Sequence, residues 1–136
     1  MKYNLSEITE LIRNRRTIYP EQFSTRKVHK EQIELILTNA QFAPTHGNTQ
    51  PWRFHVYMEK GLETLSTFLG ETYLAITPEE KQNNQKLAKL IRRPSLASAV
   101  IAVSMKRQED ERIPELEEIE AVACAIQNMH LSCTAY

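Results

Sequence analysis

The sequence predicts one globular domain that mixes several helices with two short strands. The chain has 136 residues, of which 41% are hydrophobic, so it can form one hydrophobic core and is short for two. Apolar residues recur at helical spacing in several segments, and two short segments have the pattern of strands. With only three glycines and six prolines, the composition is that of neither a collagen-like nor a disordered chain.

Two amphipathic helices are expected in the first third of the chain. The first should cover residues 6–14, with Ser6 as its N-terminal cap, and the second should cover residues 30–41. Their apolar residues are Leu5, Ile8, Leu11 and Ile12 in the first helix, and Ile33, Ile36, Leu37 and Ala40 in the second. This spacing of three to four residues places them on one face of each helix.

The middle of the chain should contain a stiff loop, a strand and a third helix. The loop, residues 43–52, holds two of the six prolines and the only tryptophan. Apolar and polar residues then alternate over residues 54–58, which predicts a half-buried strand that ends before Gly61. Apolar residues at helical spacing follow, and they predict a helix over residues 62–69.

The second half should add two helices and a second strand. A helix is expected to begin at Pro78 and to end at Pro94, since proline is tolerated in a first helical turn but not beyond it. The continuous apolar run 99–103 predicts a strand buried on both faces, and the charged residues 106–112 predict a solvated loop. A long helix, with the apolar content of a central one, should run from Pro114 to the end of the chain.

Charge and cysteine content narrow the classes of function. Lys plus Arg equals 17 and Asp plus Glu equals 17, so a general nucleic-acid binder is disfavoured. No apolar run reaches the length of a membrane span or of a signal peptide, so a cytoplasmic protein without membrane contact is expected. Cys124 and Cys133 would lie on opposite faces of one helix at about 100° per residue, which predicts neither a disulfide nor a zinc site.

Two segments carry residues suited to a ligand. Arg15, Arg16 and Thr17 offer two guanidinium groups and a hydroxyl that suit a phosphate, although arginines at a helix end also complement the helix dipole. The loop offers Thr45, His46, Asn48 and Gln50 between Pro44 and Pro51, a polar set that suits a flat heterocycle. We expect Trp52 to lie in the core and His46 to make a polar contact, because no catalytic triad accompanies it.

The order and spacing of three blocks resemble the FMN-dependent nitroreductase family, and the small members of that family most of all. The blocks are Arg15-Arg16-Thr17 after the first helix, Ala43-Pro44-Thr45-x-x-Asn48-x-Gln50-Pro51-Trp52-x-Phe54, and a late helix with Glu120 and Gln127-Asn128-Met129-x-Leu131. The resemblance covers residues 5 to 136.

This resemblance implies an α+β fold with an antiparallel sheet flanked by helices, in an interwoven homodimer with a long central helix. FMN would lie between the two chains, with Arg15, Arg16 and Thr17 at its phosphate and ribityl side. From the partner subunit, Pro44, Thr45, His46 and Asn48 would reach the isoalloxazine, and Gln50 would support their loop. Electrons would pass from NAD(P)H through flavin N5 to a nitroaromatic, quinone or enone in a ping-pong reaction.

Three expectations complete the interpretation. The last helix has no Gly, Lys or Arg at its end, so residues 1–136 are expected to be one nitroreductase-like domain of a longer or truncated protein, without the C-terminal part of the family fold. A first alternative to the enzyme is a member of the same fold that binds or senses flavin without catalysis. A second is a helical interaction module. The sequence selects neither the electron acceptor nor NADH over NADPH.

Overall fold

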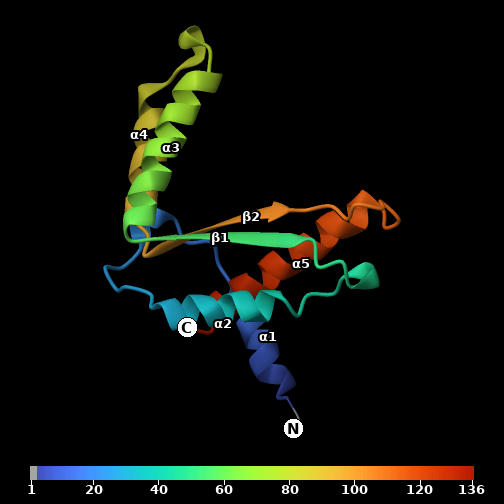
Figure 1. The fold of residues 1–136 in the computed structure, drawn as a ribbon. Helices are drawn as coiled ribbons and strands as arrows, with labels where there is room; N and C mark the ends of the chain where they lie inside the picture. The colour runs from blue at the N-terminus through green and yellow to red at the C-terminus, as the bar shows by residue number, and fades with distance from the viewer. Residues whose placement is uncertain (1–2) are drawn as a thin grey trace. The chain divides into compact units, whose positions relative to one another are not determined.

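A computed structural model describes residues 3–136 of the chain (Figure 1). The elements in these residues are α1 (Leu5–Asn14), η1 (Pro20–Gln22), α2 (Lys30–Ala40), η2 (His46–Asn48), β1 (Trp52–Met58), α3 (Lys60–Ile76), η3 (Glu79–Lys81), α4 (Asn84–Ser95), β2 (Ala99–Met105) and α5 (Glu115–Thr134), where η marks a 3-10 turn. The strands β1 and β2 pair antiparallel, and beyond them the Lys106 N–H donates to the Pro51 carbonyl oxygen at 2.7 Å. Helices combined with an antiparallel sheet confirm the α+β class.

The described residues fold as two compact units, each assembled from separate stretches of the chain. The first unit contains residues 3–17, 29–54 and 103–136, and the second contains residues 18–28 and 55–102. Both strands therefore contribute residues to both units. The single domain expected from the sequence stays a prediction.

The core of the first unit lies between α2 and α5. On α5, the buried residues follow one another at intervals of three or four, which places them on one face of the helix. Ala40 of α2 and Ala125 of α5 are both 0% exposed, so small side chains allow the two helices to approach closely here. Around these alanines pack the buried side chains of Ile33, Ile36, Ala121 and Met129.

Three polar side chains tie α2 to α5 beside this core. The Asn128 side-chain amide donates to the Asn39 carbonyl oxygen at 3.2 Å, and the Asn39 amide donates to Ser132 Oγ at 2.9 Å. The Asn39 carbonyl oxygen, in the last turn of α2, also accepts from the Phe42 N–H at 3.2 Å. Asn128 therefore adds a second hydrogen bond, from α5, to a carbonyl that already has a backbone partner.

The second unit contains a hairpin of α3 and α4 (Figure 1). The buried residues Leu62, Ser66, Gly70 and Tyr73 lie on one face of α3. A Cβ atom added at Gly70 would lie 2.9 Å from Ile91 Cγ1, so glycine permits the close contact between the helices. The Tyr73 hydroxyl accepts a hydrogen bond from the Asn83 N–H at 2.8 Å and thereby fixes the start of α4.

Two helix starts differ from the prediction because asparagine caps them. Asn4, rather than Ser6, caps α1, since its side chain accepts from the Ser6 N–H at 3.0 Å. Asn83 caps α4 by accepting from the Lys86 N–H at 3.0 Å, so α4 begins at Asn84 and not at Pro78. Pro94 lies in the last turn of α4 instead of ending it.

The turn after β1 and the burial of the strands also differ from the prediction. Glu59, with a φ of 48°, turns the chain after β1, whereas Gly61 lies inside α3, which extends to Ile76. No residue of β2 is fully buried, so the expectation of burial on both faces was wrong. Within the described residues β2 has only β1 as a neighbouring strand, so no strand pairs with its other edge.

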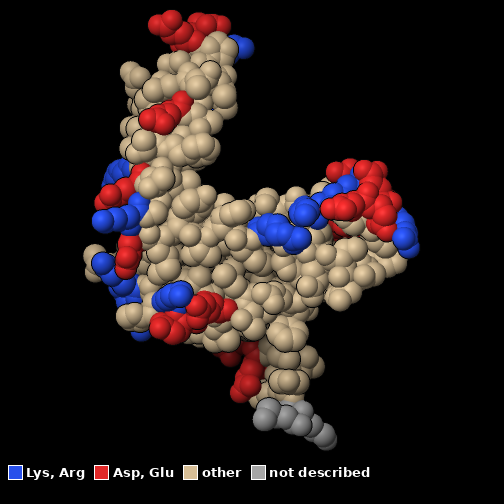
Figure 2. All heavy atoms as spheres, in the orientation of Figure 1, with Lys and Arg blue, Asp and Glu red and all other residues tan. Residues whose placement is uncertain are grey.

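The charged loop between β2 and α5 is exposed at most of residues 106–112, as predicted. Figure 2 shows acidic and basic side chains interspersed at this loop on the face drawn. Within this loop Arg107 is less exposed, because its side chain turns toward the buried Glu118 of α5. Arg107 Nε lies 3.8 Å from Glu118 Oε2. Among residues 3–136, no helix has the length and apolar content needed to cross a membrane.

Candidate functional site

The predicted phosphate-binding residues lie where α1 ends. The N–H of Arg15, the C-terminal cap of α1, donates to the Leu11 carbonyl oxygen at 3.2 Å. Arg16 Nη1 donates to the carbonyl oxygens of Arg13 and, at 2.9 Å, of Arg15, so this guanidinium does complement the helix end. Within residues 3–136, neither Arg15 nor Arg16 has a carboxylate within 4.0 Å. Both therefore keep donors for an anion, and Thr17 is exposed beside them.

The predicted flavin-binding loop, residues 43–50, has an unusual backbone. Gly47, Asn48 and Gln50 have φ angles of 58°, 54° and 44°. This left-handed region is disfavoured for residues other than glycine and is least costly for asparagine. The loop is therefore held in a conformation that free chains rarely adopt, as is common at binding sites.

Hydrogen bonds within the loop stabilise this backbone. Thr45 Oγ1 lies 3.0 Å from Thr49 Oγ1 and accepts from the Gln50 N–H at 3.3 Å. Arg53 Nη1 donates to the Gln50 carbonyl oxygen at 2.9 Å. The side-chain amides of Asn48 and Gln50 are exposed and make no hydrogen bond to any described residue, so they are free to bind a ligand.

Buried residues hold both ends of the loop. Ala43 is 6% exposed, Pro51 is fully buried and Trp52 is 5% exposed. This confirms that Trp52 belongs to the core. Pro44 remains exposed next to Ala43, at the surface of the loop.

One residue that sequence reasoning missed contacts this loop. Glu117, in the first turn of α5, accepts a hydrogen bond from His46, with 2.6 Å between Nδ1 and Oε2. The sequence did not single out Glu117, because the first turn of α5 also contains Glu115 and Glu118. A Cβ atom added at the neighbouring Gly47 would lie 3.5 Å from Ile113 Cδ1, so Gly47 also lies close to the start of α5.

The structure brings together only part of the predicted site. Pro44, Thr45, His46, Asn48 and Gln50 share one loop, and both this loop and the segment 15–17 belong to the first unit. No hydrogen bond or ion pair within residues 3–136 joins the loop to Arg15, Arg16 or Thr17. The two predicted parts of the site are therefore not joined directly within one chain.

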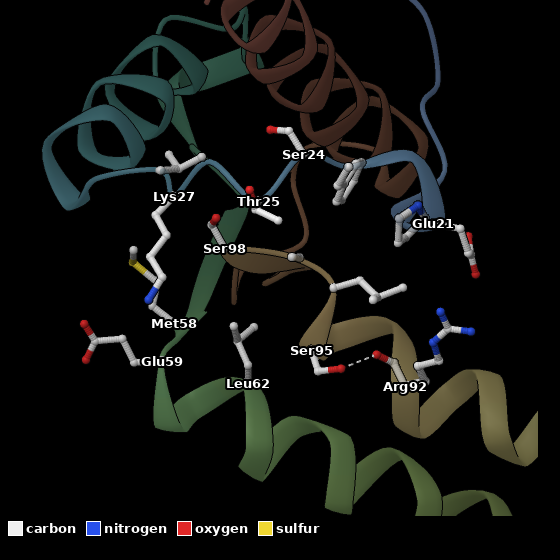
Figure 3. A pocket seen from close by; sticks show the side chains of 15 residues that line it. Glu21, Ser24, Thr25, Lys27, Met58, Glu59, Leu62, Arg92, Ser95 and Ser98 are labelled. Atoms are coloured by element: carbon white, nitrogen blue, oxygen red, sulfur yellow. Dashed lines mark hydrogen bonds between the residues drawn. The ribbon is translucent and has the colours of Figure 1, made fainter.

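A separate pocket of about 530 Å³ lies within the second unit (Figure 3). Its lining combines basic Lys27 and Arg92 with acidic Glu21 and Glu59, around apolar side chains such as Leu62. A backbone hydrogen bond and the nearby Arg93 lower the pKa of Glu21. None of the eight predicted cofactor-binding residues lines this pocket, and its mixed charges favour no single class of ligand.

Comparison with known proteins identifies the fold. The sequence profile of the nitroreductase family matches residues 12–136. "Putative NAD(P)H nitroreductase YdjA" of Escherichia coli K12 is 30% identical over 105 residues, which are 77% of this chain and 55% of that protein. The chain thus spans about half the length of this relative.

Solved structures of nitroreductases have the same fold. A nitroreductase-like family protein from Bacillus cereus superposes with a TM-score of 0.80 at 24% identity, over 98% of this chain and 66% of its own. A nitroreductase with bound FMN from Desulfitobacterium hafniense has a TM-score of 0.64 at 21% identity, over 98% of this chain and 66% of its own. The nitroreductase-like fold expected from the three sequence blocks is confirmed, and the chain belongs to the nitroreductase family.

Proposed function

We propose that this chain is the flavin-binding part of an FMN-dependent oxidoreductase that transfers electrons from NAD(P)H to a small organic acceptor. The observation that carries the proposal is the family match over residues 12–136, which includes both the arginine pair and the polar loop. The relative from Desulfitobacterium hafniense contains bound FMN, and the name of YdjA gives NAD(P)H as the reductant.

The residues of this chain fit the chemistry of FMN. Its phosphate needs cations, and Arg15 and Arg16 have guanidinium groups without carboxylate partners among residues 3–136. Its isoalloxazine is flat with polar edges, and the exposed amide of Asn48 provides both donors and an acceptor. The left-handed backbone of the loop leaves the Asn48 side chain exposed and without a hydrogen-bond partner among residues 3–136.

Each group of residues has a separate task in this proposal. Arg15, Arg16 and Thr17 bind the phosphate and ribityl side, while Pro44, Thr45, His46 and Asn48 position the ring and Gln50 supports their loop. When bound, FMN supplies the two-electron transfer from NAD(P)H to a nitroaromatic, quinone or enone, in two successive half-reactions. No side chain then needs to act as a nucleophile.

We also propose that the site is completed in a homodimer, with the loop of one subunit at the flavin of the other. The absence of bonds between the loop and residues 15–17 within one chain is consistent with this arrangement. Large apolar side chains are exposed on the first unit, including Phe42 at 81%, Leu116 on α5 at 65% and Ile119 on α5 at 49%. A second subunit would remove this apolar surface from water.

The test is the absorbance spectrum of the purified chain after incubation with FMN and desalting. Retained flavin absorbance that bleaches when NADH or NADPH is added supports the oxidoreductase. Flavin that is retained but not bleached by either nucleotide supports binding without catalysis. A protein that takes up no FMN at micromolar concentration contradicts the proposal.

Arginine variants sharpen this test. Arg15→Ala and Arg16→Ala should each weaken FMN binding about 10-fold to 100-fold, because each removes a charged hydrogen-bond donor. Arg13→Ala, on the same helix end but outside the predicted site, is the matched control and should bind as the parent chain does. Equal effects of all three variants would indicate a general charge effect and would contradict the assigned roles.

A further inference from the structure

The contact between His46 and Glu117 joins the flavin-binding loop to α5. The two residues lie 71 positions apart, and 2.6 Å separates His46 Nδ1 from Glu117 Oε2. It is the shortest side-chain contact of the loop, compared with 3.0 Å between the hydroxyl oxygens of Thr45 and Thr49. Both partners are partly exposed, with side-chain exposures of 60% for His46 and 42% for Glu117, so a bound molecule can still reach the imidazole.

The chemistry of this contact determines which ring nitrogen carries the proton. An ionised carboxylate only accepts hydrogen bonds, so Nδ1 of His46 must be the donor. A neutral imidazole has one N–H, and the other nitrogen then has a free lone pair. Glu117 therefore selects the tautomer in which Nε2 of His46 is an acceptor, although an unbound histidine in water prefers the proton on Nε2.

The contact also adjoins a segment of left-handed backbone. His46 immediately precedes Gly47 and Asn48, whose φ angles are 58° and 54°. Glycine adopts this region readily and asparagine at low cost, so neighbouring contacts select this conformation without having to overcome strain. From the side of α5, the described structure provides Glu117 at His46 and Ile113 beside Gly47. Glu117 is the polar one of these two supports.

We propose that Glu117 is the positioning residue of the flavin-binding loop. It keeps the proton of His46 on Nδ1, so that Nε2 accepts a hydrogen bond from an N–H or O–H group of the molecule bound at the loop. The nature of that molecule rests on the proposed FMN function, whereas the tautomer of His46 does not. The two parts can therefore be tested separately.

The first experiment measures the tautomer in the protein without flavin. Long-range 1H–15N correlation spectra of imidazole-labelled protein at alkaline pH distinguish the protonated nitrogen, and a His46→Gln variant assigns the signals. The parent chain should have the proton on Nδ1, because the Glu117 carboxylate only accepts, whereas the amide in Glu117→Gln pairs equally well with either tautomer. In Glu117→Leu the proton should move to Nε2. An unchanged tautomer in Glu117→Leu would overturn the proposal.

The second experiment measures FMN binding in a double-mutant cycle. Glu117→Leu should weaken FMN binding about two- to fivefold, the range expected for the loss of one partly exposed hydrogen bond. In a His46→Gln background, Glu117→Leu should have no further effect, because Glu117 acts through His46. Glu115→Leu is the matched control, since Glu115 lies in the same helical turn and contacts Arg107 at 4.0 Å rather than the loop.

The outcomes separate the two proposals. If the parent chain binds no FMN but the tautomer changes as expected, the FMN function fails and the pairing of His46 with Glu117 stands. If FMN binds and Glu117→Leu weakens it equally with and without His46, Glu117 acts on the fold and not through His46. That additive result would overturn its role as a positioning residue.

Discussion

Replacing the three glycines by alanine, one at a time, should stabilise the protein at one position and destabilise it at the other two, although the chemical change is the same. At Gly47 the backbone decides the effect. Its φ of 58° is costly for alanine, whereas the added Cβ would lie 3.5 Å from Ile113 Cδ1, an ordinary contact. We expect Gly47→Ala to lower the free energy of unfolding by about 1 kcal/mol, from the left-handed backbone alone.

The other two glycines lie in α3 and serve as internal controls. At Gly61 the added Cβ would lie 3.7 Å from Tyr57 Cβ, so only helix propensity changes, and Gly61→Ala should stabilise by about 0.5–1 kcal/mol. At Gly70 the same gain is opposed by a contact of 2.9 Å with Ile91 Cγ1. Because overpacking costs about 1–3 kcal/mol, Gly70→Ala should destabilise by up to about 2 kcal/mol.

Urea unfolding, followed by circular dichroism and by the fluorescence of Trp52, measures these differences. With a slope of about 2 kcal/mol per molar urea, a change of 1 kcal/mol moves the midpoint by about 0.5 M. The expected order of midpoints is Gly61→Ala above the parent chain, and the parent chain above both Gly47→Ala and Gly70→Ala. A Gly47→Ala protein as stable as the parent chain would refute the reasoning from φ.

Two further predictions concern the two units separately. Ile36 of α2 is 4% exposed, and its replacement by alanine should lower the free energy of unfolding by about 2–5 kcal/mol. A urea midpoint unchanged within error would show that α2 does not pack against α5 there. The pKa of Glu21 lies below its ordinary value of 4.5 because of a backbone hydrogen bond and Arg93, so this carboxylate stabilises the fold above pH 4.5 and loses that contribution as the pH falls through the lowered pKa. Carboxyl NMR should find the Glu21 pKa closer to 4.5 in Arg93→Gln, and the same low value in both proteins would exclude a role for Arg93.

Much of the fold could be predicted from periodicity. The helical spacing of Ile33, Ile36 and Ala40 gave α2 to within one residue, because one face of that helix is buried against α5. The burial of Trp52 was also predicted correctly. In each case a local pattern corresponds to a local environment, which a sequence can reveal.

Failures occurred where one residue decided a boundary. Asn83 fixes the start of α4 through a side-chain bond, whereas the prediction relied on Pro78. Glu59 turns the chain with a φ of 48°, which nothing in its identity indicates. The partnership of His46 with Glu117 joins segments 71 residues apart, and no spacing rule relates them. Long-range contacts of this kind depend on how the helices pack.

The amide contacts between α2 and α5 have a mechanical consequence. Apolar packing between α2 and α5 has no direction of its own, whereas Asn128 reaches the Asn39 carbonyl oxygen, and Asn39 reaches Ser132, in only one register. The predicted flavin-binding loop follows the end of α2 near Asn39, and its His46 is bonded to Glu117, which lies about 16 Å along α5 from Asn128. The hydrogen bonds of Asn39 and Asn128 therefore fix the position of α2 along α5. This position determines the distance that the loop must span between the end of α2 and Glu117.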